Sequence, residues 1–257
     1  MAITRVQQKN GSTGGFGTST SWTIALDSNP TAGNCLFLYL TSKVALSITS
    51  VVQSGSSASW TLLTSATTTN RFIYVYGLVN VPSGSTSTIT LTLSSAANNF
   101  CSIIEEISGL ATASVLDKTS TANGAATNTY TTGSTATTST ASEYWVNIYA
   151  YYNGSDVNLD ATAASPTNGY TVFGALNTSP NPVKSGDSGW TGTGIRPSPL
   201  DTFGMFIAYQ IASTASTAGG NVTDNNSRSN DYIGLAITLL STSSAVTARR
   251  RVISSFM

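Results

Sequence analysis

The sequence predicts an all-β protein: an antiparallel β-sandwich, jelly-roll-like, that forms a single domain over residues 1–241 and is followed by an extended C-terminal tail over residues 242–257. Three observations lead to this fold class. Short segments alternate apolar and polar residues, turn-forming clusters separate those segments, and no convincing amphipathic helix is present. Roughly ten to twelve short strands with turns between them are typical of a sandwich or jelly roll.

Alternation with a period of two indicates strands that bury one face and expose the other. It occurs in "TSWTIAL" (20–26), "STSTITLTL" (85–93), "FGMFIAYQI" (203–211) and "YIGLAITLL" (232–240). The segment "NCLFLYL" (34–40) is almost continuously apolar, which predicts a central strand that is covered on both sides. Clusters such as "NPTAG", "VPSGS" and "SPTNG" predict turns.

Two long polar segments leave alternatives open. Residues 112–141 are rich in threonine and serine and are either a linker that divides the chain or long strands of a single sandwich. Strands are favoured, because threonine is a good strand former and a linker would favour proline or charge. Residues 177–201 are rich in proline and glycine and predict a long surface loop, a kind of loop that is commonly functional.

The composition excludes several classes of function. Only 9% of the residues are charged and the net charge is zero, which argues against a nucleic-acid partner and against binding to a membrane surface. No apolar run is long enough to span a membrane, and the N-terminus lacks the pattern of a signal peptide. We therefore expect synthesis in a host cytoplasm. Cys35 and Cys101 lie in apolar runs and are expected to be buried free thiols rather than a disulfide.

The four residues Gly186–Gly189, "GDSG", resemble the surroundings of a protease nucleophile. The chain contains no histidine, so the usual base for Ser188 is missing. Lys184 lies four residues away in a segment rich in glycine and proline, where nothing would hold it as a substitute base. The motif is interpreted as a turn, and no catalytic residue is assigned.

Other acidic residues are candidates for a chemical role, but each of them also has a simpler structural interpretation. Glu105 and Glu106 are neighbours in a strand, so they point to opposite faces and cannot flank one substrate. One is expected to find a partner inside, and the other to face solvent or a neighbouring subunit. Two oxygen-rich loops imitate calcium sites but lack the full ligand pattern, so no metal and no cofactor is assigned. Their residues are Asp156, Asn158 and Asp160, and Asp224, Asn225, Asn226 and Asp231.

The segment "EYWVNIYAYYNG" (143–154) predicts a strand with an unusual second face. Its even positions, 144 to 150, are expected in the core. Its odd positions form a row with Trp145, Asn147, Tyr149 and Tyr151, which together with Trp190 are candidates for a sugar-stacking platform or a subunit interface. A third interpretation places the row beneath the 177–201 loop.

Several motifs resemble a family of serine-, threonine- and glycine-rich sandwich proteins of tailed bacteriophages. They are "TAGN" (31–34), "WT" (60–61), an aromatic strand at 74–76, "EISGL" (106–110) and "LD" (116–117). The closing strands at 204–216 and 231–240 also resemble this family, and the likeness covers residues 1–241. Val115 departs from the family pattern, which has proline there.

This resemblance implies a jelly-roll-like fold and a place on the virion, and it transfers no catalytic residue. We expect a non-enzymatic structural protein on the virion surface, a capsid decoration or head-fibre protein that forms a homo-oligomer, dimer or trimer. Its partners would be other copies of itself and the major capsid protein or another virion protein. The alternative is a carbohydrate-binding adhesin or tail component that recognises glycans on the host surface.

The last residues of the chain predict an assembly anchor. Three consecutive arginines, Arg249, Arg250 and Arg251, precede the apolar residues Ile253 and Phe256. We expect the arginines to meet acidic groups of another subunit while the apolar residues fill a groove on it. The alternative is an ordinary frayed terminus.

Overall fold

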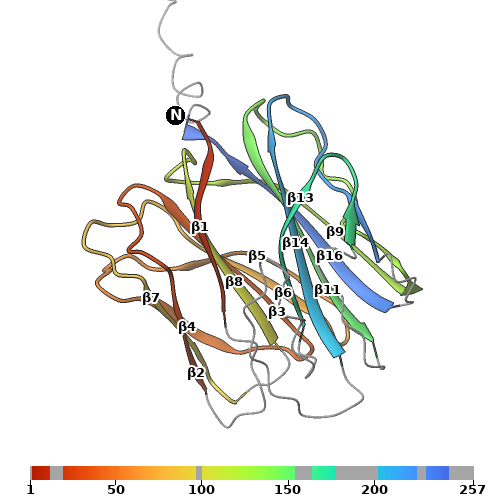
Figure 1. The fold of residues 1–257 in the computed structure, drawn as a ribbon, viewed down its shortest axis with the longest axis horizontal. Helices are drawn as coiled ribbons and strands as arrows, with labels where there is room; N and C mark the ends of the chain where they lie inside the picture. Colours follow the sequence, from red (N-terminus) through yellow and green to blue (C-terminus); the bar gives the residue numbers. More distant parts are fainter. Residues whose placement is uncertain are drawn as a thin grey trace, which may run out of the picture.

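The computed structural model describes residues 2–11, 20–96, 100–153, 164–177, 202–224 and 230–242. These ranges contain sixteen β-strands in four antiparallel sheets and no α-helix, which confirms the all-β class and the sandwich architecture. Two halves of the chain lie side by side in Figure 1, one coloured red to yellow and the other green to blue.

The first half, strands β1–β8, forms the first unit. Its inner sheet has five strands in the order β1-β8-β3-β6-β5, and its outer sheet has three strands in the order β2-β7-β4. The strands are β1 (Thr4–Asn10), β2 (Ser21–Ala25), β3 (Cys35–Ser42), β4 (Ile48–Gln53), β5 (Thr61–Thr67), β6 (Phe72–Leu78), β7 (Thr88–Leu93) and β8 (Phe100–Ser108).

The second half, strands β9–β16, forms the second unit with the same arrangement. Its inner sheet has the order β9-β16-β11-β14-β13 and its outer sheet the order β10-β15-β12. The strands are β9 (Leu116–Thr127), β10 (Thr129–Thr131), β11 (Glu143–Asn153), β12 (Ala164–Pro166), β13 (Thr171–Asn177), β14 (Thr202–Ala212), β15 (Asn221–Asp224) and β16 (Asn230–Leu240).

The four sheets stack as layers, with the two inner sheets packed against each other. Strand β3 shows why: all of its residues are buried, because alternate side chains enter two different cores. Phe37 and Tyr39 enter the central core between the inner sheets, whereas Leu36 and Leu38 enter the core between the inner and outer sheets of the first unit. This confirms the prediction of a central strand covered on both sides.

The threonine- and serine-rich segment 112–141 contains strands, as predicted. Strand β9 lies at the edge of the second inner sheet and pairs with β16, and β10 belongs to the second outer sheet. The chain has more sheets than the single sandwich that the sequence predicted for residues 1–241, because each unit closes its own outer core. The shared central core still joins both units into one body.

The two cysteines are buried free thiols, as predicted. In the pairing of β3 with β8, Cys35 lies opposite Ile107 and Cys101 lies opposite Thr41. Six residues of strand separate the two positions, a distance of about 20 Å at roughly 3.3 Å per residue. A disulfide between them is excluded in this fold.

Gly234 allows the second outer sheet to approach the second inner sheet. A Cβ atom at this position would lie 2.2 Å from the carbonyl oxygen of Thr131, a backbone atom at the end of β10. We expect Gly234→Ala to lower the free energy of unfolding by about 1–3 kcal/mol, because backbone must move to relieve the overlap. Chemical denaturation measures the change.

Gly77→Ala is the matched control. It is also a buried strand glycine, but its added Cβ would meet Leu63 Cδ1 at 2.7 Å, the end of a side chain that can rotate. We expect a smaller loss there. Equal losses in the two variants would contradict the role assigned to Gly234.

Candidate functional site

A buried charged cluster lies in the central core, where the two units meet. The carboxylate of Glu105, on β8, accepts hydrogen bonds from the hydroxyls of Tyr39 on β3 and, at 2.9 Å, of Tyr144 on β11. Arg5 Nε donates to Glu105 Oε2 at 3.1 Å, and Arg5 Cζ lies 4.6 Å from the ring centroid of Tyr209 on β14. These five residues form the Glu105 cluster, which links both units.

Burial determines what the Glu105 cluster can do. Glu105 has no solvent exposure, and burial raises the pKa of its carboxyl, with Arg5 and the two tyrosine hydroxyls acting in the opposite direction. Burial, followed by the negative charge of Glu105, also raises the pKa values of Tyr39 and Tyr144 well above the ordinary range. A substrate has no access to these groups, so the cluster is a polar tie between sheets.

The raised pKa of Glu105 predicts a pH dependence. Below the carboxyl's unfolded pKa of about 4.3, Glu105 is protonated in both states and its contribution to stability is fully present. Between the two pKa values the folded state binds more protons than the unfolded state, so this contribution falls as pH rises and is fully lost above the folded pKa. The free energy of unfolding of wild type minus that of Glu105→Gln should therefore fall with rising pH and then level off.

Denaturation of both proteins between about pH 4 and pH 9 tests this sign, since the other titrating groups cancel in the difference. A difference that rises with pH would show that attraction to Arg5 outweighs burial, and the assigned direction would be wrong.

Glu106, the neighbour of Glu105, is also fully buried, so the expectation that one of the two acids would face solvent or another subunit is wrong. The two side chains do lie on opposite faces. Glu106 Oε1 accepts hydrogen bonds from the backbone N–H of Thr31 at 2.9 Å and from Asn34 Nδ2 at 2.5 Å. Gln7 Nε2 donates to Oε2 at 2.6 Å. The turn at 31–34 covers Glu106, and all of these partners belong to the first unit.

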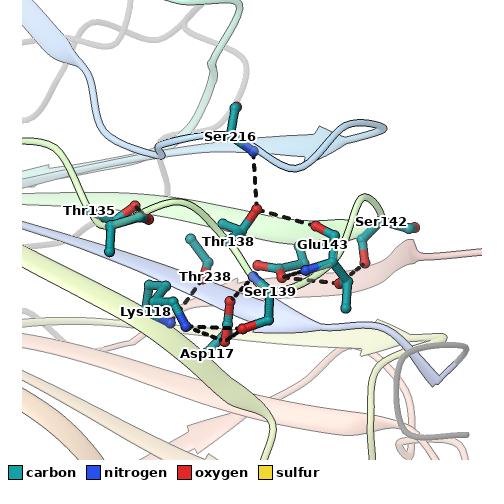
Figure 2. A network of polar contacts seen from close by, with 11 residues as sticks. Asp117, Lys118, Thr135, Thr138, Ser139, Ser142, Glu143, Ser216 and Thr238 are labelled. Atoms are coloured by element: carbon teal, nitrogen blue, oxygen red, sulfur yellow. Dashed lines mark hydrogen bonds and ion pairs between the residues drawn. The ribbon is translucent and has the colours of Figure 1, made fainter. Parts of the chain in front are cut away.

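A second polar cluster fastens the segment between β10 and β11 onto the start of β9 (Figure 2). Asp117 accepts hydrogen bonds from the backbone N–H of Ser139 at 2.7 Å and from the Ser139 hydroxyl, and it forms an ion pair with Lys118 at 2.9 Å. Glu143 Oε1 accepts from the backbone N–H and the hydroxyl of Thr140, at 3.2 and 3.1 Å. The cluster comprises Asp117, Lys118, Ser139, Thr140 and Glu143.

The electrostatics of this Asp117 cluster distinguish its two acids. Burial acts to raise the pKa of Asp117, but the hydrogen bonds from Ser139 and the ammonium of Lys118 outweigh it, and the net pKa is lowered. Burial raises the pKa of Glu143, and the negative charge of Asp117 adds to the effect. Asp117 therefore holds its partners as a carboxylate.

Lys118 Nζ also lies 3.0 Å from the hydroxyl of Ser139, which is the geometry of a serine–lysine pair. A lysine activates a serine only as a neutral amine that accepts the proton. Here Lys118 is ion-paired with Asp117, so its ammonium donates to the hydroxyl instead. Sequence reasoning missed this contact, because Lys118 and Ser139 are 21 residues apart and meet only where the segment between β10 and β11 lies against the start of β9.

The row of odd positions on β11 is not a surface, so the candidate platform of Trp145, Asn147, Tyr149 and Tyr151 is wrong as an exposed face. All four side chains are at most 6% exposed. The second outer sheet covers them: Tyr149 donates a hydrogen bond to the carbonyl of Gly220 at 2.9 Å, and Tyr151 stacks on Tyr130. The even positions, 144 to 150, lie in the central core as predicted.

Several candidates lie outside the described residues. These are Trp190, the Lys184 and Ser188 pair, Asp156, Asn158, Asp160, Asn225, Asn226, and the tail residues Arg249, Arg250, Arg251, Ile253 and Phe256. Of the second oxygen-rich loop, Asp224 is the last residue of β15, and Asp231 lies in β16, where its carboxylate pairs with Arg71 at 2.8 Å. Within the described ranges, no group of three or more histidine, cysteine, aspartate or glutamate residues is arranged to hold a metal ion.

A polar pocket of about 310 Å³ lies at one end of the second outer sheet. Its lining residues are Thr131, Gly133, Ser134, Thr167, Asn168, Gly219, Gly220 and Asn221. Thr131 Oγ1 accepts from the N–H of Gly133, and Thr167 Oγ1 exchanges hydrogen bonds with the backbone of Asn221. These side chains hold the turns together and carry no charge, so the pocket is not assigned as a catalytic site.

The protein is all-β, and Glu105, Glu106 and Asp117 each hold strands or turns of it together. No protein-family model, curated protein or solved structure matches the chain. Among the described residues, no helix has the length and apolar character needed to cross a membrane.

Proposed function

We propose that this chain is a non-enzymatic structural protein of a phage virion, a capsid decoration or head-fibre component whose two units are jelly-roll-like. The observation that carries the proposal is the role of three acids, of which Glu105 and Glu106 are buried and Asp117 is partly buried. Glu105, Glu106 and Asp117 each accept several hydrogen bonds that tie strands or turns together. Glu105 and Glu106 lack the accessibility that acid–base chemistry requires, and Asp117 is held as a carboxylate by Ser139 and Lys118.

The positions that resemble the phage family also support a structural role. Glu106, from "EISGL", binds Thr31 and Asn34 at the two ends of "TAGN", so two of the family-like motifs contact each other. Asp117, from "LD", binds Ser139. These contacts hold the fold together, so the resemblance in these motifs concerns the fold.

The exposed surface of β9 suits contacts with other protein copies. Thr119, Thr121 and Asn123 form an exposed row along this edge strand, and none of them is charged. Such a surface requires little desolvation of charge when another protein covers it. The alternative of a glycan-binding adhesin loses its main support, because the aromatic row on β11 is buried.

The proposal predicts where the protein is found. Antibodies raised against the chain should label the outside of tailed phage particles produced from the genome that encodes it. Labelling confined to unassembled protein would contradict the proposal, and so would substrate turnover that Ser139→Ala abolishes without loss of stability.

Deletion of residues 245–257 tests the proposed anchor. Because every described strand ends before this segment, we expect the truncated protein to keep its thermal stability and its far-UV circular dichroism spectrum. Its occupancy on purified particles should fall to background. A control of full length replaces Arg249, Arg250 and Arg251 by glutamine, and its occupancy on the particles separates the loss of the three charges from the loss of the whole segment. Wild-type occupancy of the truncated protein would refute the anchor.

A further inference from the structure

The two units share more than their strand order. Counting from β9 as the first strand of the second unit, its inner sheet has the order 1-8-3-6-5 and its outer sheet 2-7-4, identical to the first unit. The irregularities of the inner sheets also correspond, although the register shift between β4 and β7 has no counterpart between β12 and β15. Register shifts occur between the first and eighth strands of both units, and between the fifth and sixth strands of both.

The contacts between the units are symmetric. Strand β5 contacts β16, and the corresponding strands β13 and β8 also contact each other. The contact of β6 with β11 corresponds in the same way to that of β14 with β3. The contact of β8 with β14 corresponds to that of β16 with β6. Strand β3 contacts its own counterpart, β11. Exchanging the two units leaves this set unchanged, which is the property of an interface with two-fold symmetry. The segments after β8 and β16 meet in the same way, through an antiparallel bridge between Leu110 and Ser241.

One feature of the central core breaks this symmetry. The inner face of the second unit contributes mainly aliphatic side chains, among them Val146, Ile148 and Leu235. The first unit contributes Glu105, which is buried and binds Tyr144 of the second unit, while Arg5 lies over the ring of Tyr209. The charged partners come from one unit, and the aromatic partners across the interface come from the other.

We propose that the chain is a tandem pair of one eight-stranded module, that the inner sheet of each module is a docking surface for a second module of the same topology, and that Arg5 and Glu105 restrict docking to a first unit with a second unit. The inner sheets then determine which two units pair, and the linker at 109–115 only joins them covalently.

The restriction follows from the chemistry of burial. In a pair of two first units, two Glu105 carboxylates would enter one core without Tyr144, and two Arg5 side chains would lack Tyr209. Each Glu105 would keep Arg5 and Tyr39 of its own unit, but it would lose the Tyr144 hydroxyl while a second like charge entered the same core. Burial of charge with fewer donors is unfavourable, so this arrangement is selected against. A pair of first and second units contains one such charged pair with all of its partners.

The test begins with the full chain and a protease site inserted at Thr112–Ser114, where three consecutive residues are exposed. After cleavage of the folded protein, native mass spectrometry should find the two fragments still associated. After unfolding and refolding of the cut mixture, we expect pairs of first with second fragments only. The double variant R5Q/E105Q, which removes both charges, should increase the fraction of first–first pairs at least tenfold.

Glu106→Gln is the matched control, because Glu106 is equally buried but binds only residues of its own unit. It should leave the pairing unchanged. Separation of the wild-type fragments on cleavage would overturn the docking surface. The restriction would be overturned if first–first pairs were equally abundant in wild type and double variant. It would also be overturned if the fragments of the double variant no longer associated.

A circular permutant gives an independent measurement on an uncut chain. It starts at Ala113, ends at Thr112 and joins residue 257 to residue 1 through a flexible linker. If the units are equivalent modules, exchanging their order should preserve the hydrogen-exchange protection of β3 and β11. Loss of protection in both strands would contradict the equivalence.

Discussion

Glu105→Ala is expected to lower the free energy of unfolding by about 3–5 kcal/mol, the range for removing one partner of a buried ion pair. The substitution leaves the hydroxyls of Tyr39 and Tyr144 in the central core without their acceptor. It also removes the carboxylate opposite Arg5, which is only 21% exposed. Urea or guanidinium denaturation, followed by tryptophan fluorescence, measures the loss.

Asp27→Ala provides the comparison, because Asp27 also forms an ion pair, with Lys9 at 2.6 Å, but is 68% exposed. An exposed pair of this kind contributes about 0–1 kcal/mol. Glu105→Gln, which keeps the shape and a hydrogen-bonding group, should fall between the two. A Glu105→Ala loss no larger than that of Asp27→Ala would show that the buried carboxylate is not the tie between the units.

The strands could be predicted from the sequence because their signal is local. In β7 the residues Ile89 and Leu91 are buried and their threonine neighbours are less so, as the alternation indicates. In β3 the continuous apolar run reports burial on both faces directly. Neither inference needs knowledge of which strand lies next to which.

The layers could not be predicted, because alternation shows that a strand has two different faces but not what covers each of them. On β11, Trp145 and Tyr149 alternate with core residues as predicted, yet a further sheet covers them. That sheet consists of the short strands β10, β12 and β15, whose three or four residues carry too little periodicity to be recognised. The sequence therefore left three covers open for this face, namely sugars, another subunit and the 177–201 loop, and a further sheet was not among them.

The polar clusters were beyond sequence reasoning for a related reason. Arg5 and Glu105 are a hundred residues apart, and Tyr144 belongs to the other unit. The expectation that one of Glu105 and Glu106 would point inward was correct, but both are buried, because the turn at Thr31–Asn34 covers the outer one. These pairs follow from the register of the strands, but a single sequence does not specify register between residues so far apart.

The burial of Trp145 gives the second large effect. Its ring packs in a small core with Tyr170, Ala208, Ala212 and Ala218, between the inner and outer sheets of the second unit. We expect Trp145→Ala to lower the free energy of unfolding by about 3–5 kcal/mol, because it removes a large buried side chain and leaves a cavity. Denaturant unfolding curves of the variant and the wild type measure the loss.

The same variant separates the two functions considered for the row on β11. A sugar-stacking tryptophan is accessible, so its loss would abolish glycan binding while stability stayed nearly constant. A tryptophan that fills a core behaves in the opposite way. Trp145→Phe sharpens the comparison, because it keeps most of the apolar volume and removes an indole N–H that is buried without a hydrogen-bond partner among the described residues. We expect that variant to lose less than half as much stability as Trp145→Ala. The wild type could instead bind glycans, and Trp145→Ala could abolish that binding without a change in stability. That result would support the sugar-stacking platform and contradict the core role of this side chain.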